Sequence, residues 1–337
     1  MSYSVYVGID VSAQSVHVVY ITSTGEVSEP FVIPQTRSGM DSLRDILLVT
    51  GYEVAGMLVV MEATGVYWMR LAVYLHGAGF SVSVINPAQA HYFARAVLQR
   101  NKTDRIDAQL LAQLAAKLQP APWQPLSETY EALYQRLTQR DTLFRMLQQE
   151  RNRLHALKHR PQMVTEVAER LEAHIGFLQA QITEIDEEFK TVVVQDPAWA
   201  RSADLLRSIK GFGPVATYWL LTATHNFTAC ASPEQIASYS GLVPRQFESG
   251  ASVRGRPAIG HAPHARLRQA LYMACLSAVQ HNPHIKSFYH RLLDRGKPRK
   301  VALCACARKL IHIAWAVVMK ERPFDPHHVQ PQTISFA

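Results

Sequence analysis

The stretch Asn-Lys-Thr-Asp-Arg-Ile-Asp-Ala-Gln-Leu-Leu, residues 101–111, carries the pattern from which the rest of the chain is interpreted. Thr103 suits the N-cap of a helix, and Asp104 and Asp107 then lie three positions apart on one helical face. The same face continues into leucines, so both carboxylates adjoin an apolar stripe that packs into an interior. Because paired acids repel one another, a bound metal ion would stabilise the arrangement. The stretch therefore predicts a metal-binding helix N-terminus.

A plainer interpretation of these residues stays open. Acids in the first turn of a helix are favoured by the helix dipole, and Lys102 and Arg105 are then solvated neighbours. In a protein that binds nucleic acid, the same two cations are candidates for phosphate contacts. The other acids of the chain decide between these interpretations.

Charge is unevenly distributed along the 337 residues, of which 48% are hydrophobic and 18% charged. Residues 1–199 hold 17 Lys+Arg and 21 Asp+Glu, a net charge of −4, whereas residues 200–337 hold 18 and 6, a net charge of +12. A basic half favours a polyanionic partner such as nucleic acid, although it also serves solubility. The length allows two or three domains with a sizeable core.

The cysteines and apolar segments point to a reduced, zinc-free, cytoplasmic protein. Four cysteines form neither CxxC pairs nor a disulfide framework. The first residues lack the features of a secretion signal. Residues 301–319 are apolar enough to suggest a membrane span, but Arg308, Lys309 and His312 interrupt them, and such charges are costly at a bilayer centre. We expect a buried helix there and no membrane partner.

Two further acids close or interrupt apolar runs in the first third of the chain. Asp10 lies within the β-branched run 5–11, and Glu62 directly follows the apolar run 57–61. A buried carboxylate without a partner is costly, so each acid is expected to face a site. The expected elements are strands at 5–11, 15–21, 27–33, 57–61 and 80–85 and helices at 39–50, 68–76, 88–98 and from Asp104 onward.

This order predicts an α/β ribonuclease-H-like domain. In such a sheet the first and fourth strands are neighbours, and the late helix crosses beside them. Asp10, Glu62, Asp104 and Asp107 would then converge on one or two divalent ions. Ligands that are all oxygen suit Mg²⁺ or Mn²⁺, which polarise phosphates and activate an attacking oxygen.

The proline-rich residues 119–125 predict a linker, followed by two long helices. Apolar residues recur at heptad-like spacing through positions 130–154 and again through 164–189, with Pro161 between them. The pattern predicts a coiled-coil hairpin. Simple packing within a monomer is one interpretation of this hairpin, and self-association is the favoured one because the seam is long.

A basic, mainly helical region follows from about Trp199. Residues 205–221 resemble a helix-hairpin-helix, in which Lys210, Gly211 and Gly213 lie where a helix N-terminus can approach a phosphate. A tight helix connection without nucleic acid explains the same residues and stays open.

Residues 245–257 combine glycine, serine and arginine without apolar periodicity, and we expect a loop. Ser249 lies among Arg245, Arg254 and Arg256, so it is a candidate nucleophile among groups that bind phosphate. A flexible basic loop that only grips a nucleic-acid backbone is the alternative.

Together these motifs resemble the DEDD transposases of bacterial insertion elements, the pilin-inversase type of bridge-RNA-guided serine recombinase. The resemblance covers nearly the whole chain and rests on Gly-Ile-Asp-Val-Ser at 8–12, Glu-Ala-Thr-Gly at 62–65, Asn-Lys-Thr-Asp-Arg-Ile-Asp-Ala at 101–108, Gly-Phe-Gly-Pro at 211–214, Tyr-Ser-Gly-Leu-Val-Pro at 239–244 and Ser-Gly-Ala-Ser-Val-Arg-Gly-Arg at 249–256. It implies a RuvC-like domain at 1–122 with Asp10, Glu62, Asp104 and Asp107 as metal ligands. Coiled-coil helices at 123–195, a mainly α-helical transposase domain at 196–325 and a tail at 326–337 follow.

The resemblance also implies a chemistry and partners. Ser249 attacks a DNA phosphodiester with help from Mg²⁺ or Mn²⁺, while Ser240 and Ser252 remain alternative nucleophiles. A non-coding bridge RNA pairs with donor and target DNA, and the active site is shared between protomers of a dimer or tetramer. The reaction takes place at the bacterial nucleoid, in the cytoplasm.

Three other functions compete with this one. A structure-selective nuclease would use the same acids with water as the nucleophile. A non-catalytic nucleic-acid-binding protein fits the basic half but leaves Asp10 and Glu62 unexplained. A kinase of the related actin-like fold also begins with Gly-Ile-Asp, yet the later half lacks its glycine-rich phosphate motifs.

Overall fold

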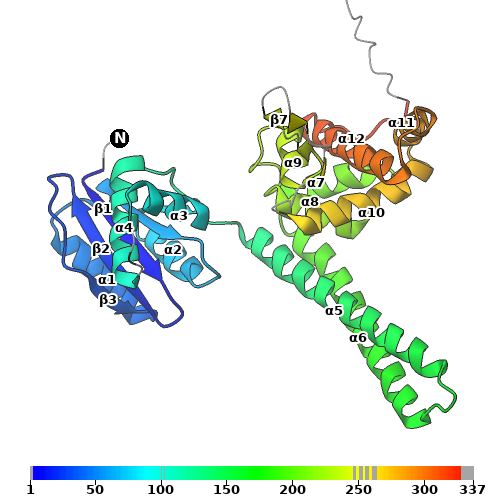
Figure 1. The fold of residues 1–337 in the computed structure, drawn as a ribbon, viewed down its shortest axis with the longest axis horizontal. Helices are drawn as coiled ribbons and strands as arrows, with labels where there is room; N and C mark the ends of the chain where they lie inside the picture. Colours follow the sequence, from blue (N-terminus) through cyan, green and yellow to red (C-terminus); the bar gives the residue numbers. More distant parts are fainter. Residues whose placement is uncertain are drawn as a thin grey trace, which may run out of the picture. The chain divides into compact units, whose positions relative to one another are not determined.

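The chain forms two compact units, which we describe separately. The computed structural model describes residues 3–99, 101, 103–245, 248–249, 253–254, 258–259 and 264–327. The first unit spans Met1–Pro125 and the second Leu126–Ala337 (Figure 1).

A five-stranded mixed sheet forms the centre of the first unit. Its strands are β1 (Val5–Val11), β2 (Ser15–Thr22), β3 (Phe31–Pro34), β4 (Met57–Glu62) and β5 (Ser81–Ile85), in the order β3-β2-β1-β4-β5. The first three strands are antiparallel neighbours, and β4 and β5 run parallel to β1. The predicted adjacency of the first and fourth strands is confirmed.

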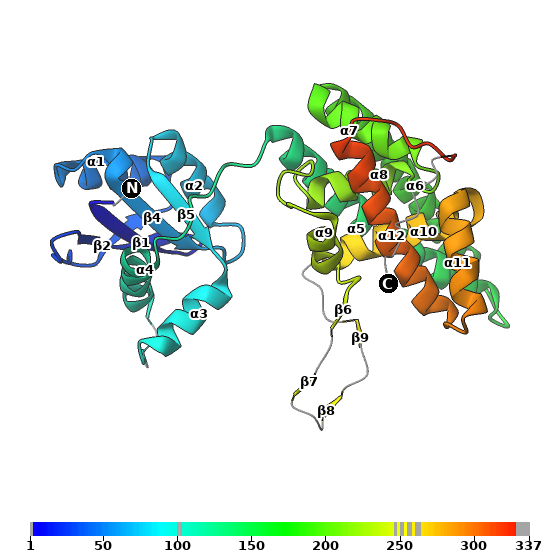
Figure 2. The same ribbon diagram turned by 90° about the horizontal axis from the view of Figure 1, so that it is seen from above.

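Helices cover both faces of the sheet (Figure 2). Side chains alternate along β1, so Val5, Val7 and Ile9 face α1 (Arg37–Val49) and α2 (Trp68–Gly77). The opposite face packs against α3 (Pro87–Ala96) and α4 (Asp104–Leu118). Asp10 belongs to this second face, because it alternates with Ile9. A short 3₁₀ helix, η1 (Val54–Gly56), precedes β4.

Helix α4 lies unusually close to β1. A Cβ atom added at Gly8 would overlap with the backbone atoms of Ala108 and Ala112 on α4. Ala108 and Ala112 are themselves fully buried, and they pack against Val19 of β2. Small side chains on both elements therefore let the helix backbone touch the strand, two residues from Asp10.

In the second unit, α5 (Glu128–Lys158) and α6 (Thr165–Val194) form a long antiparallel hairpin. Its buried seam includes Leu133, Leu137, Leu143, Leu147, Leu178, Ile182, Ile185 and Phe189. Ion pairs join the helices at Arg136 with Glu188, Arg140 with Asp186 and Lys158 with Glu172. The heptad-like spacing of residues 130–154 places Phe144 in the predicted seam, but this side chain is 50% exposed, and Leu143 is buried instead.

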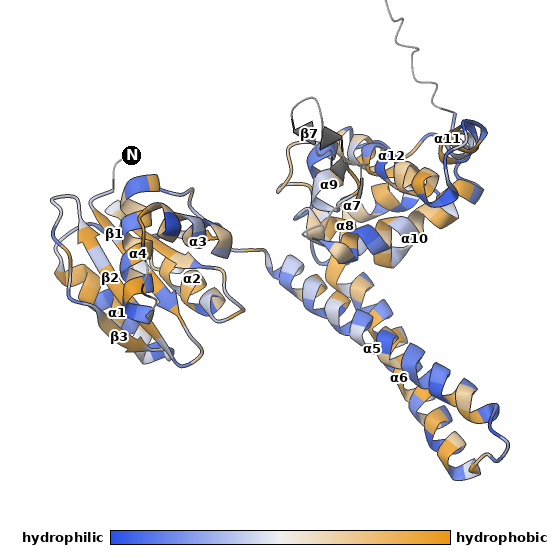
Figure 3. Cartoon of the chain, in the orientation of Figure 1, coloured by the Kyte–Doolittle hydropathy of each residue, from blue (hydrophilic) through white to orange (hydrophobic). Residues whose placement is uncertain are grey.

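The remaining helices pack into one apolar core. They are α7 (Pro197–Ser208), α8 (Pro214–Ala223), α9 (Pro233–Tyr239), α10 (Ala265–His281), α11 (Pro283–Asp294) and α12 (Arg299–Met319). Within the described residues, α12 is the one helix long and apolar enough to cross a membrane, and half of its most apolar window is buried in the protein. It packs against α7, α9, α10 and α11. In Figure 3, hydrophobic and hydrophilic residues are mixed along α12.

The segment predicted to be a loop contains short strands. β6 (Pro244–Arg245) pairs with β9 (Ala258–Ile259), and β7 (Glu248–Ser249) pairs with β8 (Val253–Arg254). The segment therefore includes two short antiparallel ladders, with β7 and β8 beyond β6 and β9 (Figure 2). Two-residue strands have too few positions for an alternation pattern to reveal them.

The contact between Gly8 and α4 can be tested by adding one methyl group. We expect Gly8→Ala to destabilise the first unit by about 1–3 kcal/mol, because the new Cβ meets backbone rather than a movable side chain. In hydrogen–deuterium exchange, peptides from β1 and α4 should then exchange at least about fivefold faster.

Gly77→Ala is the matched control, because nothing lies within 4 Å of a Cβ added there. Exchange in β1 and α4 should stay as in the wild type. Equal exchange in Gly8→Ala and Gly77→Ala would show that the close approach is unimportant.

Candidate metal centre and serine hairpin

The four acids predicted from the sequence lie where the ends of two strands meet the first turn of α4 in the first unit. Asp10 is near the end of β1, Glu62 is the last residue of β4, and Asp104 and Asp107 form the first turn of α4. Thr103 caps α4, because its side chain accepts a hydrogen bond from the amide of Ile106 at 3.3 Å. The predicted start of the helix is confirmed.

Asp10 and Asp104 approach each other together with a histidine. The ligand atoms of Asp10, His17 and Asp104 all lie within 4.8 Å of one another. His17 Nδ1 is 3.6 Å from a carboxylate oxygen of Asp104, whose side chain is 64% exposed. Three potential ligands from β1, β2 and α4 thus meet at a partly open position.

His17 is the residue that the sequence interpretation missed. It lies directly opposite Asp10 in the antiparallel pairing of β1 and β2, and opposed residues share a face of the sheet. The predicted strands at 5–11 and 15–21, joined by a short turn, already imply that Asp10 and His17 are paired. From the sequence alone, however, His17 was interpreted only as part of the second strand.

The pKa of Asp10 depends on its burial and on the charges of the three other acids. Burial raises the pKa of Asp10 to about 6, and the negative charges of Asp107, Asp104 and Glu62 add to this increase, while His17 opposes it. Glu62 also accepts a hydrogen bond from the Thr64 hydroxyl at 2.7 Å. Glu62 and Asp107 are therefore close enough to act on Asp10, although they are outside the three-ligand group.

This donor set fits a divalent cation. Carboxylate oxygens are hard ligands of the kind that Mg²⁺ and Mn²⁺ prefer, and neighbouring carboxylates repel one another without a positive charge between them. The imidazole of His17 offers a nitrogen ligand, or a positive charge when it is protonated. The residues present therefore fit a divalent ion.

The candidate nucleophile Ser249 is in β7, where its backbone pairs with Val253. We refer to the strands β6 to β9 as the serine hairpin. Arg254 pairs with Glu248 in the same ladder, and Arg245 pairs with Ala258 in the other. Lys102, Ser252 and Arg256 lie outside the described residues.

Ser240 occupies a different environment from the one expected of a nucleophile. It is fully buried, and its hydroxyl donates a hydrogen bond to the carbonyl oxygen of Ala237 at 3.0 Å, at the end of α9. A substrate phosphate has no access to this atom in the folded chain. The structure therefore favours a structural role for Ser240.

The connection between α7 and α8, where a helix-hairpin-helix was predicted, contains one glycine packed against a neighbouring helix and one exposed glycine. Gly211 has a φ of +119°, and a Cβ there would collide with Ala278 of α10. Gly213 is the N-cap of α8 and has no neighbour within 4 Å of an added Cβ. Lys210 is exposed beside them, as Arg105 is on α4. Gly211 thus serves helix packing, whereas Gly213 and Lys210 are accessible.

Comparisons with known proteins link both regions to DNA rearrangement. A model of the DEDD transposases of IS110 type, described as a transposase, matches residues 7–158, and one described as the transposase IS116/IS110/IS902 family matches residues 203–290. The first range includes the four acids and His17, and the second includes Ser249.

Two relatives extend these matches along the chain. The pilin gene-inverting protein of Moraxella bovis is 32% identical over 321 residues, which are 95% of this chain and 97% of that protein. The transposase for insertion sequence element IS1328 of Yersinia enterocolitica is 25% identical over 80% of this chain and 85% of its own length.

Removing the Asp10 charge should have opposite effects with and without metal. We expect Asp10→Asn to raise the thermal midpoint in the presence of a chelator by a few degrees, because a partly buried charge among like charges is lost. The gain should be on the order of 1 kcal/mol after allowance for solvent screening. It should be larger at pH 8 than at pH 4, where the raised pKa leaves the wild-type carboxyl protonated in the fold.

Addition of Mg²⁺ or Mn²⁺ should then stabilise the wild type and leave Asp10→Asn nearly unchanged. Glu53→Gln removes an exposed charge before the opposite end of β4, and it should keep the metal response. Differential scanning fluorimetry reports all three midpoints. An undiminished metal response in Asp10→Asn would contradict the assignment of the centre.

Proposed function

The chain belongs to the IS110/IS116 family of DEDD transposases, and from this membership we propose that it moves an insertion element by attack of Ser249 on DNA. The observation that carries the proposal is the match of both regions of the chain to transposase families. The meeting of Asp10, Asp104 and His17 beside Glu62 and Asp107 supports metal-assisted chemistry on a phosphate. The charge of +12 on residues 200–337 supports a DNA partner.

The proposed step exchanges one phosphate ester for another. The Ser249 oxygen attacks the phosphorus and loses its proton to solvent, and the bond from phosphorus to the 3′ oxygen breaks. The departing 3′ oxygen takes up a proton, which leaves a free 3′ hydroxyl and a phosphoserine link to the 5′ end. A 3′ hydroxyl of another strand reverses the step, so the phosphodiester energy is conserved.

The proposed roles of the chain's own groups follow from their charge. Arg245, Arg254 and Arg256 bind the phosphate oxygens through paired N–H donors. The acids Asp10, Glu62, Asp104 and Asp107 hold a divalent ion, which when bound supplies positive charge that offsets the charge developing on the phosphate. Lys102, Arg105, Lys210 and the amides near Gly211 and Gly213 grip the DNA backbone.

We further propose that a bridge RNA selects donor and target DNA by base pairing. The protein then needs no base-specific contacts of its own, and its cations bind backbones. The acids and the serine belong to different units, so a homo-oligomer can build one active site from two protomers. The reaction would take place on DNA in the cytoplasm of a bacterium.

A second function is favoured by the position of the acids alone. All four lie in the first unit, and a metal centre of this kind suffices for hydrolysis with water as the nucleophile. A structure-selective DNA nuclease would therefore need the acids and not Ser249. The covalent intermediate separates the two functions.

We expect a covalent protein–DNA adduct when the chain is incubated with Mg²⁺, the non-coding RNA of its element and labelled donor and target DNA. A denaturing gel should show the adduct for the wild type and lose it in Ser249→Ala, because the alanine has no oxygen to attack phosphorus. Asp10→Asn should reduce the adduct by about 100-fold or more.

Ser252→Ala and Ser240→Ala test the two alternative nucleophiles. Both should retain the adduct, and a thermal melt shows whether the buried Ser240 site still folds. Loss of the adduct in Ser252→Ala alone would move the nucleophile there. Metal-dependent cleavage without an adduct in any variant would replace the recombinase by the nuclease.

A further inference from the structure

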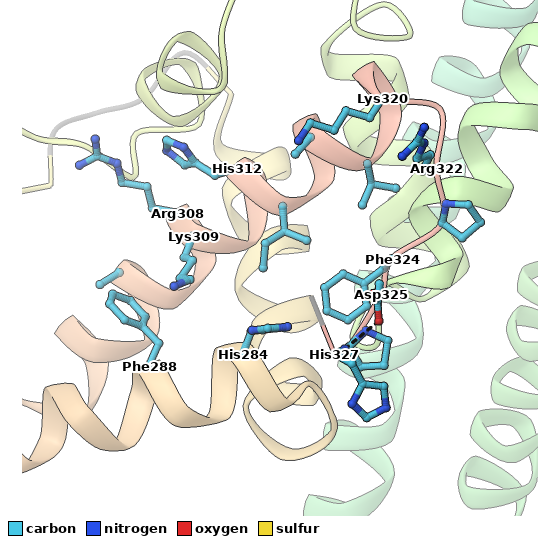
Figure 4. Close-up of a pocket in the computed structure, with 16 residues that line it drawn as sticks. His284, Phe288, Arg308, Lys309, His312, Lys320, Arg322, Phe324, Asp325 and His327 are labelled. Atoms are coloured by element: carbon cyan, nitrogen blue, oxygen red, sulfur yellow. Dashed lines mark hydrogen bonds between the residues drawn. The ribbon is translucent and has the colours of Figure 1, made fainter. Parts of the chain in front are cut away.

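A groove of about 1130 Å³ lies on the second unit. It is formed by one face of α12, by α11 and by the segment at residues 322–327 that follows α12 (Figure 4). Its volume lies just above the roughly 300–1,000 Å³ of typical small-molecule pockets, which leaves room for a segment of a polymeric ligand.

Positive charge is concentrated along this groove. Arg308 and Lys309 lie toward one end of the α12 face, and Lys320 and Arg322 lie at the other (Figure 4). Asp325 is the one acid among the described lining residues, and it accepts a hydrogen bond from the amide of His327 at 2.8 Å. The groove thus presents four cations to one anion, a balance that selects a polyanion.

The interior of the groove is apolar and aromatic. Phe288 of α11 lies under the Lys309 ammonium group, which is 4.8 Å from the ring centroid. The ring of Phe324 meets the imidazole of His284 edge-on, with 5.7 Å between the ring centroids. The backbone amide of Phe324 donates a hydrogen bond to Ser208 Oγ at 2.8 Å. This last bond ties the segment after α12 to α7. Two aromatic rings, Phe288 and Phe324, therefore line the groove together with the cations.

We propose that this groove binds a single strand of nucleic acid, with phosphates on the cations and bases on the aromatic wall. A strand without a partner can turn its phosphates and its bases toward different surfaces, and grooves for single strands combine these two elements. A duplex presents phosphates outward and keeps its base faces stacked inside, so an apolar wall gains little from it.

The length of the groove is consistent with several nucleotides. Lys309 and Lys320 are 11 residues apart on α12, which corresponds to about 16 Å at 1.5 Å per residue. At about 3.4 Å per stacked nucleotide, that distance spans about five nucleotides. Cations at both ends then contact phosphates at both ends of the bound strand.

The groove also adjoins the element that leads to Ser249. His312 Nδ1 lies 3.8 Å from a carboxylate oxygen of Glu234 on α9, and α9 ends at Tyr239, shortly before β6. The inference rests on the proposed function: the strand held here is displaced DNA or guide RNA that continues toward the serine hairpin. Both polymers share the phosphodiester backbone and stacked bases that the groove recognises.

Anisotropy of labelled oligothymidylate and oligouridylate, measured on the full chain with a chelator present, tests the inference without any chemistry. Arg308→Gln/Lys309→Gln and Lys320→Gln/Arg322→Gln should each weaken binding about tenfold or more. Each should also reduce the slope of log K against log salt by about 1.4, since each lost phosphate contact accounts for about 0.7. The polymer that binds more tightly identifies the source of the strand.

Lys297→Gln/Lys300→Gln is the matched control, because it removes the same charge from two exposed positions, one before α12 and one in its first turn. It should leave the affinity and the salt slope nearly unchanged. Phe288→Leu should weaken binding without changing the slope, because stacking is lost and the cations remain. Thermal melts of each variant confirm that it is folded.

Three results would overturn the inference: groove variants that bind like the control, a duplex that depends equally on the groove, or displacement of the strand by polyglutamate at equal charge. Ser249→Ala should retain normal strand binding. If Ser249→Ala loses the adduct while the groove variants bind normally, the groove inference alone fails. If an adduct persists in Ser249→Ala, the assigned nucleophile fails and the groove result stands independently.

Discussion

The contact of α4 with β1 at Gly8 is the constraint on which the candidate metal centre depends. Because Gly8 has no side chain and Ala108 and Ala112 are small, the helix backbone rests directly on the strand. The first turn of α4 then brings Asp104 next to Asp10. A bulkier residue at any of these contacts would separate the helix from the strand, and the acids would separate with it.

The same contact creates an electrostatic cost. The pKa of Asp10 is raised to about 6 by burial and by three neighbouring acids, so at neutral pH its charge destabilises the fold. Apolar packing of the sheet and helices offsets that cost. Such a site is poised for a cation, since binding removes repulsion that the fold already carries. The clustered acids thus lower the stability of the first unit and at the same time form a centre that can bind a cation.

The sequence predicted most of the first unit because its signals are local. Alternation marked β1 and β2, Thr103 marked the start of α4, and the strand order brought Glu62 beside Asp10. His17 was missed because its role depends on pairing across two strands. Phe144 was misplaced because an antiparallel pair of straight helices does not follow one strict heptad. The short strands around Ser249 have no periodicity to detect, and the groove on α12 depends on side chains far apart in the sequence.

The two units divide the proposed chemistry between them. The acids that would hold the ion belong to the first, whereas Ser249 and the cationic groove belong to the second. If the contact between α4 and β1 builds a metal centre, crystals grown with Mn²⁺ should show an anomalous-scattering peak in direct contact with carboxylate oxygens of Asp10 and Asp104. Density that instead shows Asp10 paired only with protein groups, with no peak beside it, would rule out a metal centre at this position.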